Sequence, residues 1–399
     1  MKIAVIFEHF GPYHIARLRG AMYEDANVQV VPIELFGKCQ TYAWNKPETH
    51  EDNNVRVVFA DGDAKSVAKK AIRDGLEQVL NDIAPDVIAV HGWSLPGASD
   101  AIGWANKNGV ALIVMSESRA NDSPRSSVKE FIKRQILATV DAGLVGAPSH
   151  AKYLTQLGIP SDGIFTGYNA VDNDYFAREA SRVRVDGQHN RLNSLPDHFP
   201  QKFFFASNRF VEKKNLNRLI QAYAKYQNNN GLPWGLVLAG DGPLRKNLVA
   251  QVDSLGLQEL VHFPGFLQYD KLPTYYGLAC AFVHVSTVEQ WGLVVNEAAA
   301  SGLPLIVSET TGCAECLIDH GRNGFLCDSL DTDSIAASLT KVAALSEKER
   351  AAMGVRSQQI VSNFGPKQFG QGLIGAAKHA MGNPRKASLM GRLIVALLP

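Results

Sequence analysis

Short apolar runs alternate along most of the chain with longer segments of helical periodicity. The apolar runs predict buried strands, and they lie at residues 2–7, 28–32, 55–59, 87–90, 111–115 and 142–146, then at 202–206, 235–239, 261–267, 281–286, 303–308 and 324–327. Helical patterns between them are clearest at residues 12–23, 63–81, 98–108, 216–227, 293–301, 333–345 and 347–363. Strands and helices in alternation are typical of an α/β fold with doubly wound parallel sheets.

The alternation is interrupted once, between residues 177 and 200. This stretch holds four arginines, two histidines and two prolines, and its periodicity is lost. A chain of 399 residues is also long for one domain. We therefore expect a Rossmann-like domain over residues 1–178, a linker over 179–200 and a second Rossmann-like domain over 201–365. Residues 366–399 are expected to form a helix that returns to the first domain, followed by an apolar and basic tail.

The stretch from Val283 to Glu315 carries the strongest functional signal. Glu289 and Gly292 lie in the loop between the strand at 281–286 and the helix at 293–301, and Glu297 lies on that helix. Ligands bind at the carboxyl ends of strands in such sheets, and a helix N-terminus favours phosphate. Two carboxylates beside it can accept hydrogen bonds from sugar hydroxyls. The pattern favours a sugar nucleotide, although two isolated glutamates are more often solvated surface charges.

Two cations follow the first strand of the second half. Arg209 and Lys214 flank a loop at a predicted strand end, where they could clamp a diphosphate between them. The alternative for this loop, taken alone, is a solvated basic surface.

Three loops of the first half also follow strands. Gly11 separates the first strand from the first helix and leaves backbone N–H groups toward the binding edge, but the GxGxxG pattern of dinucleotide sites is absent. His91 follows one later strand, and Glu117 and Arg119 follow the next. These three are candidates for the acceptor or sugar side of a site, and ordinary surface loops are the alternative.

The order of motifs from Phe203 to Cys327 resembles retaining glycosyltransferases of family 4. The sequence has Glu289-x7-Glu297, the family's glutamate-x7-glutamate signature. Further motifs of this segment are Arg-Phe-x3-Lys-Asn at 209–215, Leu-Ala-Gly-Asp-Gly-Pro at 238–243, Phe-Pro-Gly-Phe-Leu at 263–267, Gly-Leu-Pro at 302–304 and Asn-Gly-Phe-Leu at 323–326. The resemblance implies the GT-B fold, in which two Rossmann-like domains face each other across a cleft.

The resemblance also implies a role for each matching position. Arg209 and Lys214 would neutralise the donor diphosphate, Glu289 would face the donor sugar, and Glu297 would bind the ribose. The other implied donor contacts are Gly11 closing over the phosphates, Phe266 and Leu267 at the nucleotide base, and the amides of Gly292 and Leu293 at sugar or phosphate. Many members carry a histidine where this chain has Glu117, so the contact made there is expected to differ.

The expected reaction is retaining transfer of a sugar from a nucleotide-diphosphate sugar to a hydroxyl. The acceptor is a glycan, a lipid-linked molecule or a small molecule, in polysaccharide or glycolipid assembly. No cofactor or metal ion is expected, because the two cations neutralise the diphosphate. The alternatives are a GT-B nucleotide-sugar epimerase or phosphorylase, and a sugar-nucleotide-binding protein without catalysis.

Composition narrows the remaining choices. A net charge of +1 gives no field that favours nucleic acid. Five cysteines, mostly in apolar segments, fit a reducing compartment, and the Cys313–Cys316 pair lacks two further ligands for zinc. The first residues do not resemble a signal peptide, and no apolar run reaches the roughly 18 residues of a membrane span. We expect a cytoplasmic protein.

Two segments suggest contact with a membrane surface. Residues 129–137 predict a basic amphipathic helix, for which packing on its own sheet is the favoured interpretation. The tail from Arg385 to Pro399 is apolar with three cations. It either packs on the N-terminal domain or lies at the inner face of the membrane against anionic headgroups.

Overall fold

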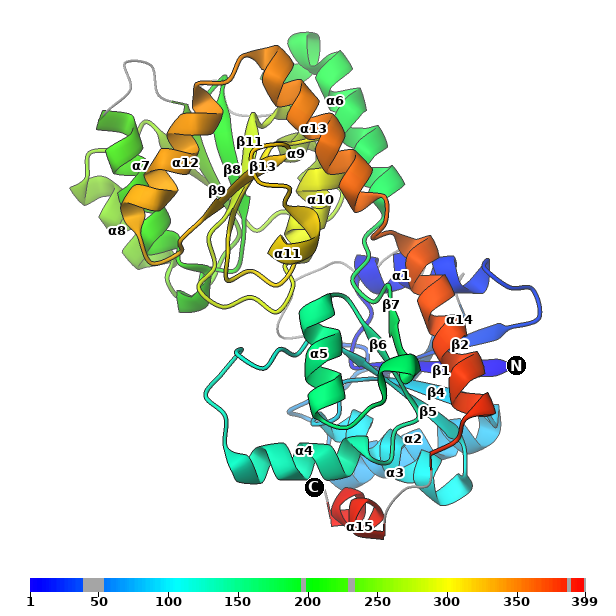
Figure 1. Cartoon of the computed structure of the whole chain (residues 1–399). Coiled ribbons are helices and arrows are strands. Elements are labelled where there is room, and N and C mark those ends of the chain that lie inside the picture. The colour runs from blue at the N-terminus through cyan, green and yellow to red at the C-terminus, as the bar shows by residue number, and fades with distance from the viewer. Residues whose placement is uncertain (39–53, 195–198, 229–233, 386–388, 398–399) are drawn as a thin grey trace. The chain divides into compact units, whose positions relative to one another are not determined.

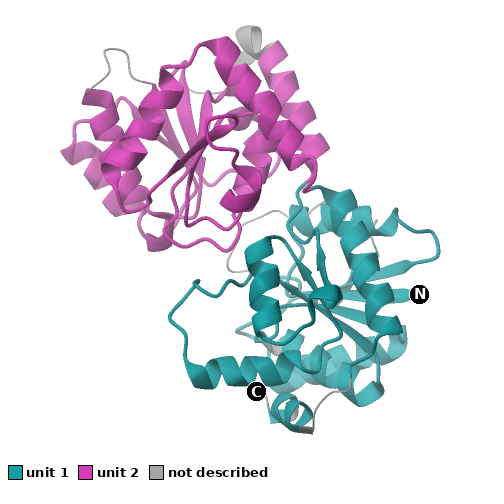
Figure 2. Ribbon diagram, viewed as in Figure 1, with its two compact units in different colours: residues 1–171, 365–399 teal, residues 172–364 magenta. Residues whose placement is uncertain are grey.

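The computed structural model describes residues 1–38, 54–194, 199–228, 234–385 and 389–397. The chain forms two compact units (Figure 2): Met1–Val171 together with Gly365–Pro399, and Asp172–Phe364. The first unit is thus discontinuous in sequence. The boundary falls before residue 178, and the C-terminal segment belongs to the first unit.

A single parallel sheet forms the centre of the first unit, with seven strands among its described residues (Figure 1). Their order is β3-β2-β1-β4-β5-β6-β7. Their bounds are β1 Lys2–Phe7, β2 Gln29–Phe36, β3 Arg56–Phe59, β4 Val87–His91, β5 Ala111–Ser116, β6 Ala142–Val145 and β7 Ile164–Thr166. Because β1 pairs with both β2 and β4, the direction in which the chain adds strands reverses there.

Helices cover both faces of this sheet. Alternate residues of β1 point to opposite faces: Ile3 and Val5 pack with α1 (Pro12–Met22) and α14 (Pro366–Gly382). Ala4 and Ile6 belong to the core on the other face. The helices of that face are α2 Lys69–Ile83, α3 Pro96–Asn108, α4 Ser127–Leu137 and α5 Pro148–Gln156. The sheet is therefore buried on both sides, which explains the continuous apolar strands.

The second unit repeats this plan with six parallel strands among its described residues, in the order β10-β9-β8-β11-β12-β13 (Figure 1). Their bounds are β8 Phe203–Ser207, β9 Gly235–Ala239, β10 Val261–Gly265, β11 Ala281–His284, β12 Leu305–Ser308 and β13 Gly324–Cys327. One face packs against α7 (Leu216–Asn228), α8 (Arg245–Ser254) and α12 (Thr332–Ala343). The other carries α9 (Leu272–Leu278) and α10 (Leu293–Ala300), and α13 (Glu347–Val361) packs against α10.

The predicted linker over residues 179–200 was wrong for most of its length. The structure has a helix, α6 (Asn173–Ser194), which packs against α9 and α10. Phe176 and Ala180 on it are fully buried. A Cβ on Gly277 of α9 would lie 2.9 Å from the carbonyl oxygen of Ala180, so glycine permits the close approach of the two helices. Residues 195–198 of the predicted linker lie outside the described part of the chain.

Three further elements differ from the sequence-based expectation. Strand β2 continues through Pro32 to Phe36, because its neighbours β1 and β3 pair with it along its length. The short strand β7 was not predicted. The tail contains a helix, α15 (Leu389–Leu397), which packs against α3 and α4. None of the helices within the described residues is both long enough and apolar enough to cross a membrane.

Candidate active site

The candidate site of the second unit lies where its sheet reverses direction. β8 and β11 are neighbours, but the chain adds β9 and β10 outside β8, and β12 and β13 outside β11. The loops after β8 and β11 therefore leave adjacent strands and run apart, which is where open α/β sheets bind ligands. Lys214 lies in the first of these loops and Glu289 in the second.

Asn215 holds the loop that follows β8. A short helical turn at Glu212–Lys214 ends at Asn215, whose φ of +58° lies in the left-handed region that asparagine tolerates. Its side-chain amide donates to the carbonyl oxygens of Val285 at 3.0 Å and Ser329 at 2.6 Å. This buried asparagine thereby fixes Lys214 against the end of β11.

Glu289 forms the centre of a buried polar cluster. Its Oε2 atom pairs with the ammonium group of Lys214, which lies 75 residues away in sequence. His284 Nε2 lies 3.3 Å from the same oxygen, and the hydroxyl of Ser286 donates to it at 3.4 Å. Ser286 Oγ also lies 3.1 Å from His284 Nε2. One carboxylate oxygen is thus surrounded by three polar partners, from the end of β11 and the loops after β8 and β11.

These contacts determine the protonation of the cluster. Burial acts to raise the pKa of Glu289, but His284 and Lys214 outweigh it and hold that pKa well below its usual range. Burial lowers the pKa of His284, which the neighbouring Glu289 only partly opposes. At neutral pH the cluster therefore combines an ionised carboxylate with a neutral imidazole.

Backbone contacts keep Glu289 in place. The amide of Gly312 donates to the carbonyl oxygen of Glu289 at 2.9 Å, and that of Cys313 donates to the carbonyl oxygen of Trp291 at 3.1 Å. A Cβ on Gly312 would lie 1.7 Å from the carbonyl oxygen of Gln290, so only glycine fits there. Gly312 and Cys313, which follow β12, thus hold the loop of Glu289 through backbone hydrogen bonds.

Gly292 and Leu293 begin helix α10, as the sequence predicted. Gly292 is the N-cap residue, with a φ of +101° that favours glycine. Glu297 lies one turn further on and is fully buried, and its Oε2 accepts a hydrogen bond of 2.6 Å from the hydroxyl of Tyr276. A ribose contact by Glu297 stays a prediction, because the described contact of this carboxylate is with a side chain of α9.

The remaining donor-side candidates lie on loops at the same edge. Arg209 is exposed in the loop after β8. Phe266 and Leu267 follow β10, and Phe266 is exposed while Leu267 is partly buried. The loop after β9 is hydrogen-bonded to the end of β10, because the amide of Gly240 donates to the carbonyl oxygen of Gly265 at 2.7 Å. The cation and the aromatic side chain thus lie on loops at the same edge of the sheet, separated by the loop after β9.

The first unit brings its candidates to the equivalent edge of its own sheet. Gly11 follows β1, and its amide donates to His14 Nδ1 at 3.0 Å. His91 ends β4, and burial, followed by the charge of Arg17, lowers the pKa of its imidazole to about 4. Gly11 and His91 therefore follow adjacent strands, at the point where this sheet also reverses direction.

Glu117 and Arg119 both follow β5 but have different partners. Glu117 Oε1 accepts a hydrogen bond of 2.6 Å from the side-chain amide of Asn169. The guanidinium of Arg119 pairs with Asp122 at 3.0 Å. Asn169 lies 52 residues after Glu117 in the sequence, so the fold brings two distant segments together here.

Sequence reasoning missed several residues of these clusters. His284 and Ser286 were interpreted as members of a buried strand, although a histidine within an apolar run was an available signal. In the first unit, the fully buried Glu34 of β2 accepts from the amide of Phe10 at 2.8 Å and lies 2.9 Å from His9 Nδ1. A carboxylate inside the apolar sequence of β2 was the corresponding signal.

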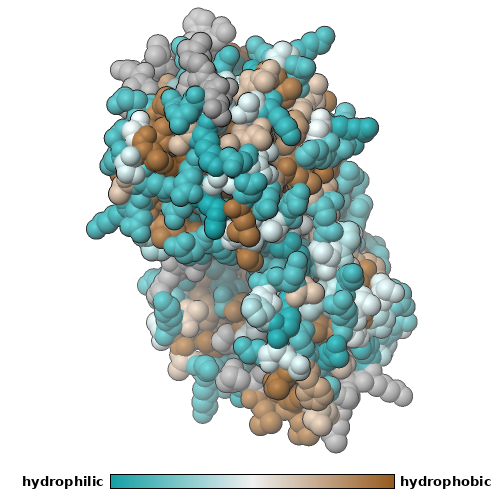
Figure 3. All heavy atoms as spheres, turned by 60° about the vertical axis from the view of Figure 1, so that its left-hand side comes forward, coloured by the Kyte–Doolittle hydropathy of each residue, from teal (hydrophilic) through white to brown (hydrophobic). Residues whose placement is uncertain are grey.

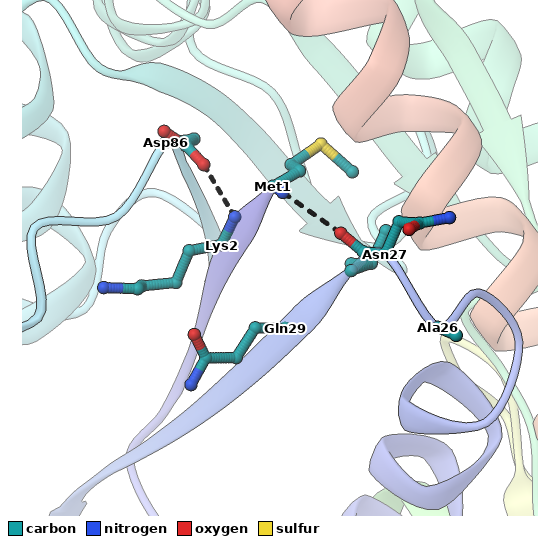
Figure 4. A pocket seen from close by; sticks show the side chains of 7 residues that line it. Met1, Lys2, Ala26, Asn27, Gln29 and Asp86 are labelled. Atoms are coloured by element: carbon teal, nitrogen blue, oxygen red, sulfur yellow. Dashed lines mark hydrogen bonds between the residues drawn. The ribbon is translucent and has the colours of Figure 1, made fainter.

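A hollow of about 530 Å³ lies at the opposite edge of the first sheet (Figure 4). It is lined by residues at the amino ends of β1, β2 and β4, and the carboxylate of Asp86 there accepts from the amide of Lys2 at 2.7 Å. This is not the edge at which the candidate residues gather. Within the described residues, no group of three histidine, cysteine or acidic side chains could hold a metal ion.

Within the described residues, the cysteines at 280, 313, 316 and 327 are not joined in disulfides, and Cys39 lies outside the described residues. Burial, with a smaller effect of Glu315, raises the pKa of Cys316 to about 12. The Cys313–Cys316 pair therefore has the character of packed thiols.

The protonation of Glu289 leads to a testable pH dependence. Its pKa is lower in the folded protein than the unfolded value of about 4.3, so its ionised form stabilises the fold above that pH. The contribution is lost as the pH falls toward the folded pKa. The advantage in unfolding free energy of the parent over Glu289→Gln should shrink by up to about 1.4 kcal/mol per pH unit below pH 4. Urea unfolding between neutral and acid pH measures it, and a constant difference would contradict the assignment.

Comparison with known proteins identifies the fold. Solved structures of the GT-B fold superimpose over nearly the whole chain. HepE of Anabaena, solved with UDP and glucose, matches with a TM-score of 0.68 and 19% identity, covering 94% of this chain and 98% of that one. The fold is therefore GT-B, as expected. Residues 194–359 match the family model described as glycosyl transferases group 1.

Relatives of known name match about half of the chain. One is the N-acetyl-alpha-D-glucosaminyl L-malate synthase of Bacillus anthracis, with 28% identity over 52% of this chain and 51% of the relative. Another is the GDP-mannose-dependent alpha-(1-6)-phosphatidylinositol monomannoside mannosyltransferase of Mycolicibacterium smegmatis, with 29% identity over 46% of this chain and 48% of the relative. The chain thus spans about half the length of the curated relatives it matches.

Proposed function

We propose that this protein is a retaining glycosyltransferase that moves a sugar from a nucleotide-diphosphate sugar to a hydroxyl group. The observation that carries the proposal is the ionised Glu289, held by Lys214 and His284 at the reversal point of the second sheet. The family match of residues 194–359 and the UDP bound to HepE support a nucleotide-sugar donor.

The chemistry rests on stabilising the departing diphosphate. Arg209 and Lys214 supply positive charge, and the N-terminus of α10 at Gly292 adds its dipole. Lys214 already neutralises Glu289, so a diphosphate would share this ammonium group with the carboxylate. Glu289 itself faces the donor sugar, where its negative charge favours the positive charge that develops on the sugar ring in the transition state.

The same proposal assigns no resident metal ion to the reaction, since the two cations do the work of charge neutralisation. Transfer is expected to proceed at an unchanged rate in the presence of a chelator. A rate that falls with EDTA and returns with a divalent cation would contradict this part of the proposal.

Arg209→Ala should weaken the binding of a nucleoside diphosphate by about 10- to 150-fold. A charge-assisted hydrogen bond to phosphate contributes roughly 1.5–3 kcal/mol, and Arg209 is exposed, so its removal leaves the fold intact. Titration calorimetry with UDP, GDP and ADP measures the affinity. Lys214→Ala should weaken binding too, but it also removes the partner of Glu289, which makes it the less specific change.

The matched control for Arg209 is Lys202→Ala. Lys202 is likewise exposed but precedes β8, so it lies at the other end of the same strand. Its removal should leave nucleotide affinity unchanged. Equal affinities of the parent and Arg209→Ala would refute a diphosphate contact at this position.

Product analysis tests the proposed reaction. Incubation with a panel of UDP-, GDP- and ADP-sugars should release nucleotide only when an acceptor hydroxyl is present, and the new bond should keep the anomeric configuration of the donor. Conversion without an acceptor would indicate an epimerase, and nucleotide binding without any turnover would indicate a binding protein.

The acceptor is proposed to be a glycan or a lipid-linked molecule. Two relatives support this range by name, the phosphatidylinositol monomannoside mannosyltransferase and the O-antigen chain mannosyltransferase B of Escherichia coli. Product analysis with a lipid-linked and a free glycan acceptor distinguishes the two. The expected cytoplasmic location stays a prediction.

A further inference from the structure

Helices α4 and α15 pack side by side on the first unit, far apart in sequence. Arg385, in the segment before α15, attaches this region to the end of α4. Its guanidinium donates to the carbonyl oxygens of Leu137 and Val140, both at 3.1 Å, and to that of Gly158 at 2.9 Å. Arg385 is therefore held in a defined place.

One side of α15 is packed. Val395 is buried in the core beneath α3 and α4, and its Cγ1 lies 3.7 Å from where a Cβ on Gly103 would be. The packing interpretation of the tail is correct for this side of the helix.

The opposite side of α15 is an exposed apolar stripe. Met390, Leu393 and Leu397 are 53%, 54% and 81% exposed. Their spacing of three and then four residues places them on one helical face. Neighbouring α4 exposes Val128 and Phe131 in the same way, at 68% and 51%. We name these five side chains the α4–α15 apolar surface. In Figure 3 apolar side chains gather at the lower end of the view, where Figure 1 has α15.

Cations accompany this apolar surface. Lys129 and Arg134 of α4 and Arg392 of α15 are exposed. The ion pairs described on α4 join Glu130 to Arg125 and Lys133. Lys129, Arg134 and Arg392 thus have no acidic partner among the described residues, and the surface combines exposed apolar groups with excess positive charge.

We propose that the α4–α15 apolar surface docks the first unit onto an anionic lipid membrane. A nine-residue helix is about 13 Å long, too short to span a bilayer but suited to lie in its interface. The stripe enters the acyl boundary, and the three cations pair with anionic headgroups. A second copy of the chain fits the surface less well, because a symmetric contact would bring the unpaired cations of both copies together.

Flotation with lipid vesicles tests the docking. The full chain should float with vesicles of phosphatidylcholine and phosphatidylglycerol, and much less with phosphatidylcholine alone. Leu393→Glu should lower the bound fraction at least about tenfold, since it replaces an apolar group that enters the membrane with a charge that anionic headgroups repel. Arg392→Gln combined with Arg134→Gln should weaken binding to the anionic vesicles and reduce its dependence on salt.

Two control variants keep the test specific. Val355→Glu places the same charge at an equally exposed valine of α13 in the second unit, and Lys348→Gln with Lys246→Gln removes two exposed cations there. Both should float like the parent. Point variants on the exposed stripe are preferable to truncation, because truncation also removes the buried Val395. Unchanged melting temperatures of the point variants establish that these variants fold.

Several outcomes would overturn the proposal. They are no flotation of the parent, equal flotation of Leu393→Glu and the parent, and a concentration-dependent dimer that Leu393→Glu dissociates in the absence of lipid. Flotation uses no donor, so its failure is separate from that of the proposed function. Nucleotide release with a water-soluble acceptor should be the same for the parent and Leu393→Glu.

Discussion

Replacing Glu289 with glutamine is expected to lower kcat by roughly 10²-fold or more while the KM for the donor changes little. The loss of one positioned electrostatic group in an active site typically has an effect of this size. Glutamine keeps the shape and one acceptor oxygen but removes the negative charge beside the sugar. It also leaves Lys214 without its described partner. Steady-state kinetics with varied donor concentration measures both constants.

Glu297→Gln is the informative comparison for this variant. The side-chain amide of the glutamine fits the buried position of Glu297 and can still accept the hydrogen bond from the hydroxyl of Tyr276. Because its implied role is in donor binding, KM should rise with a smaller change in kcat. Glu309→Gln, at an exposed carboxylate after β12, serves as the control and should behave like the parent. The reverse partition of effects would mean that the two roles are exchanged.

Gly240→Ala should destabilise the second unit by about 2–5 kcal/mol. Its φ of +127° is strained for any residue with a side chain, and an added Cβ would lie 1.8 Å from the carbonyl oxygen of Asn208. Left-handed backbone costs roughly 1–2 kcal/mol and forced overpacking about 1–3 more. The clash acts on the loop that carries Arg209, so nucleotide affinity should fall as well. Thermal unfolding should show a decrease on the order of 10 °C.

Gly256→Ala separates the cost of the positive φ from the cost of the clash with Asn208. Gly256 has a φ of +67°, and no atom lies within 4 Å of an added Cβ. An alanine there would have backbone strain but no steric clash. It should lose about 1 kcal/mol and keep full nucleotide affinity. Equal melting temperatures for the two variants would show that the contact with Asn208 is of no consequence.

Much of the fold could be predicted because each sheet is buried on both faces. Strands in this position are apolar throughout, so β1, β5 and β9 stand out as runs between amphipathic helices. Helix α6 was missed for the opposite reason. Its apolar side is narrow, and four arginines lie in the stretch interpreted as a linker. Its burial depends on the glycine of α9 that allows close packing, which no local pattern reveals.

The candidate site divides in the same way. Glu289 and Gly292 lie in loops whose position after a strand could be inferred locally. The pairing of Glu289 with Lys214 joins residues 75 positions apart and depends on β8 and β11 being neighbours. His284 was missed because a residue at the end of a buried strand is readily assigned to the core with its apolar neighbours, although a histidine in such a run is itself a signal. Only the fold places its ring against the carboxylate.

Asn215 shows how one side chain can have two structural roles that no local sequence pattern reveals. Its backbone has the left-handed conformation that glycine would adopt freely, and its side chain adds two hydrogen bonds across the loops. Asparagine at position 215 therefore combines a left-handed backbone with hydrogen bonds that join neighbouring loops.

The discontinuity of the first unit affects the order in which a growing chain can fold. Helix α14 supplies one side of the core around Ile3 and Val5, and it crosses α1 so closely that a Cβ on Gly370 would lie 2.5 Å from the carbonyl oxygen of Gly20. The ribosome synthesises α14 after the entire second unit. That unit is contiguous and can fold as soon as it emerges, whereas one apolar face of the first sheet is covered by α1 but still lacks α14 until residues 366–382 follow. We therefore expect that a nascent chain needs chaperones most before α14 is synthesised, when apolar surface of the first sheet is still exposed.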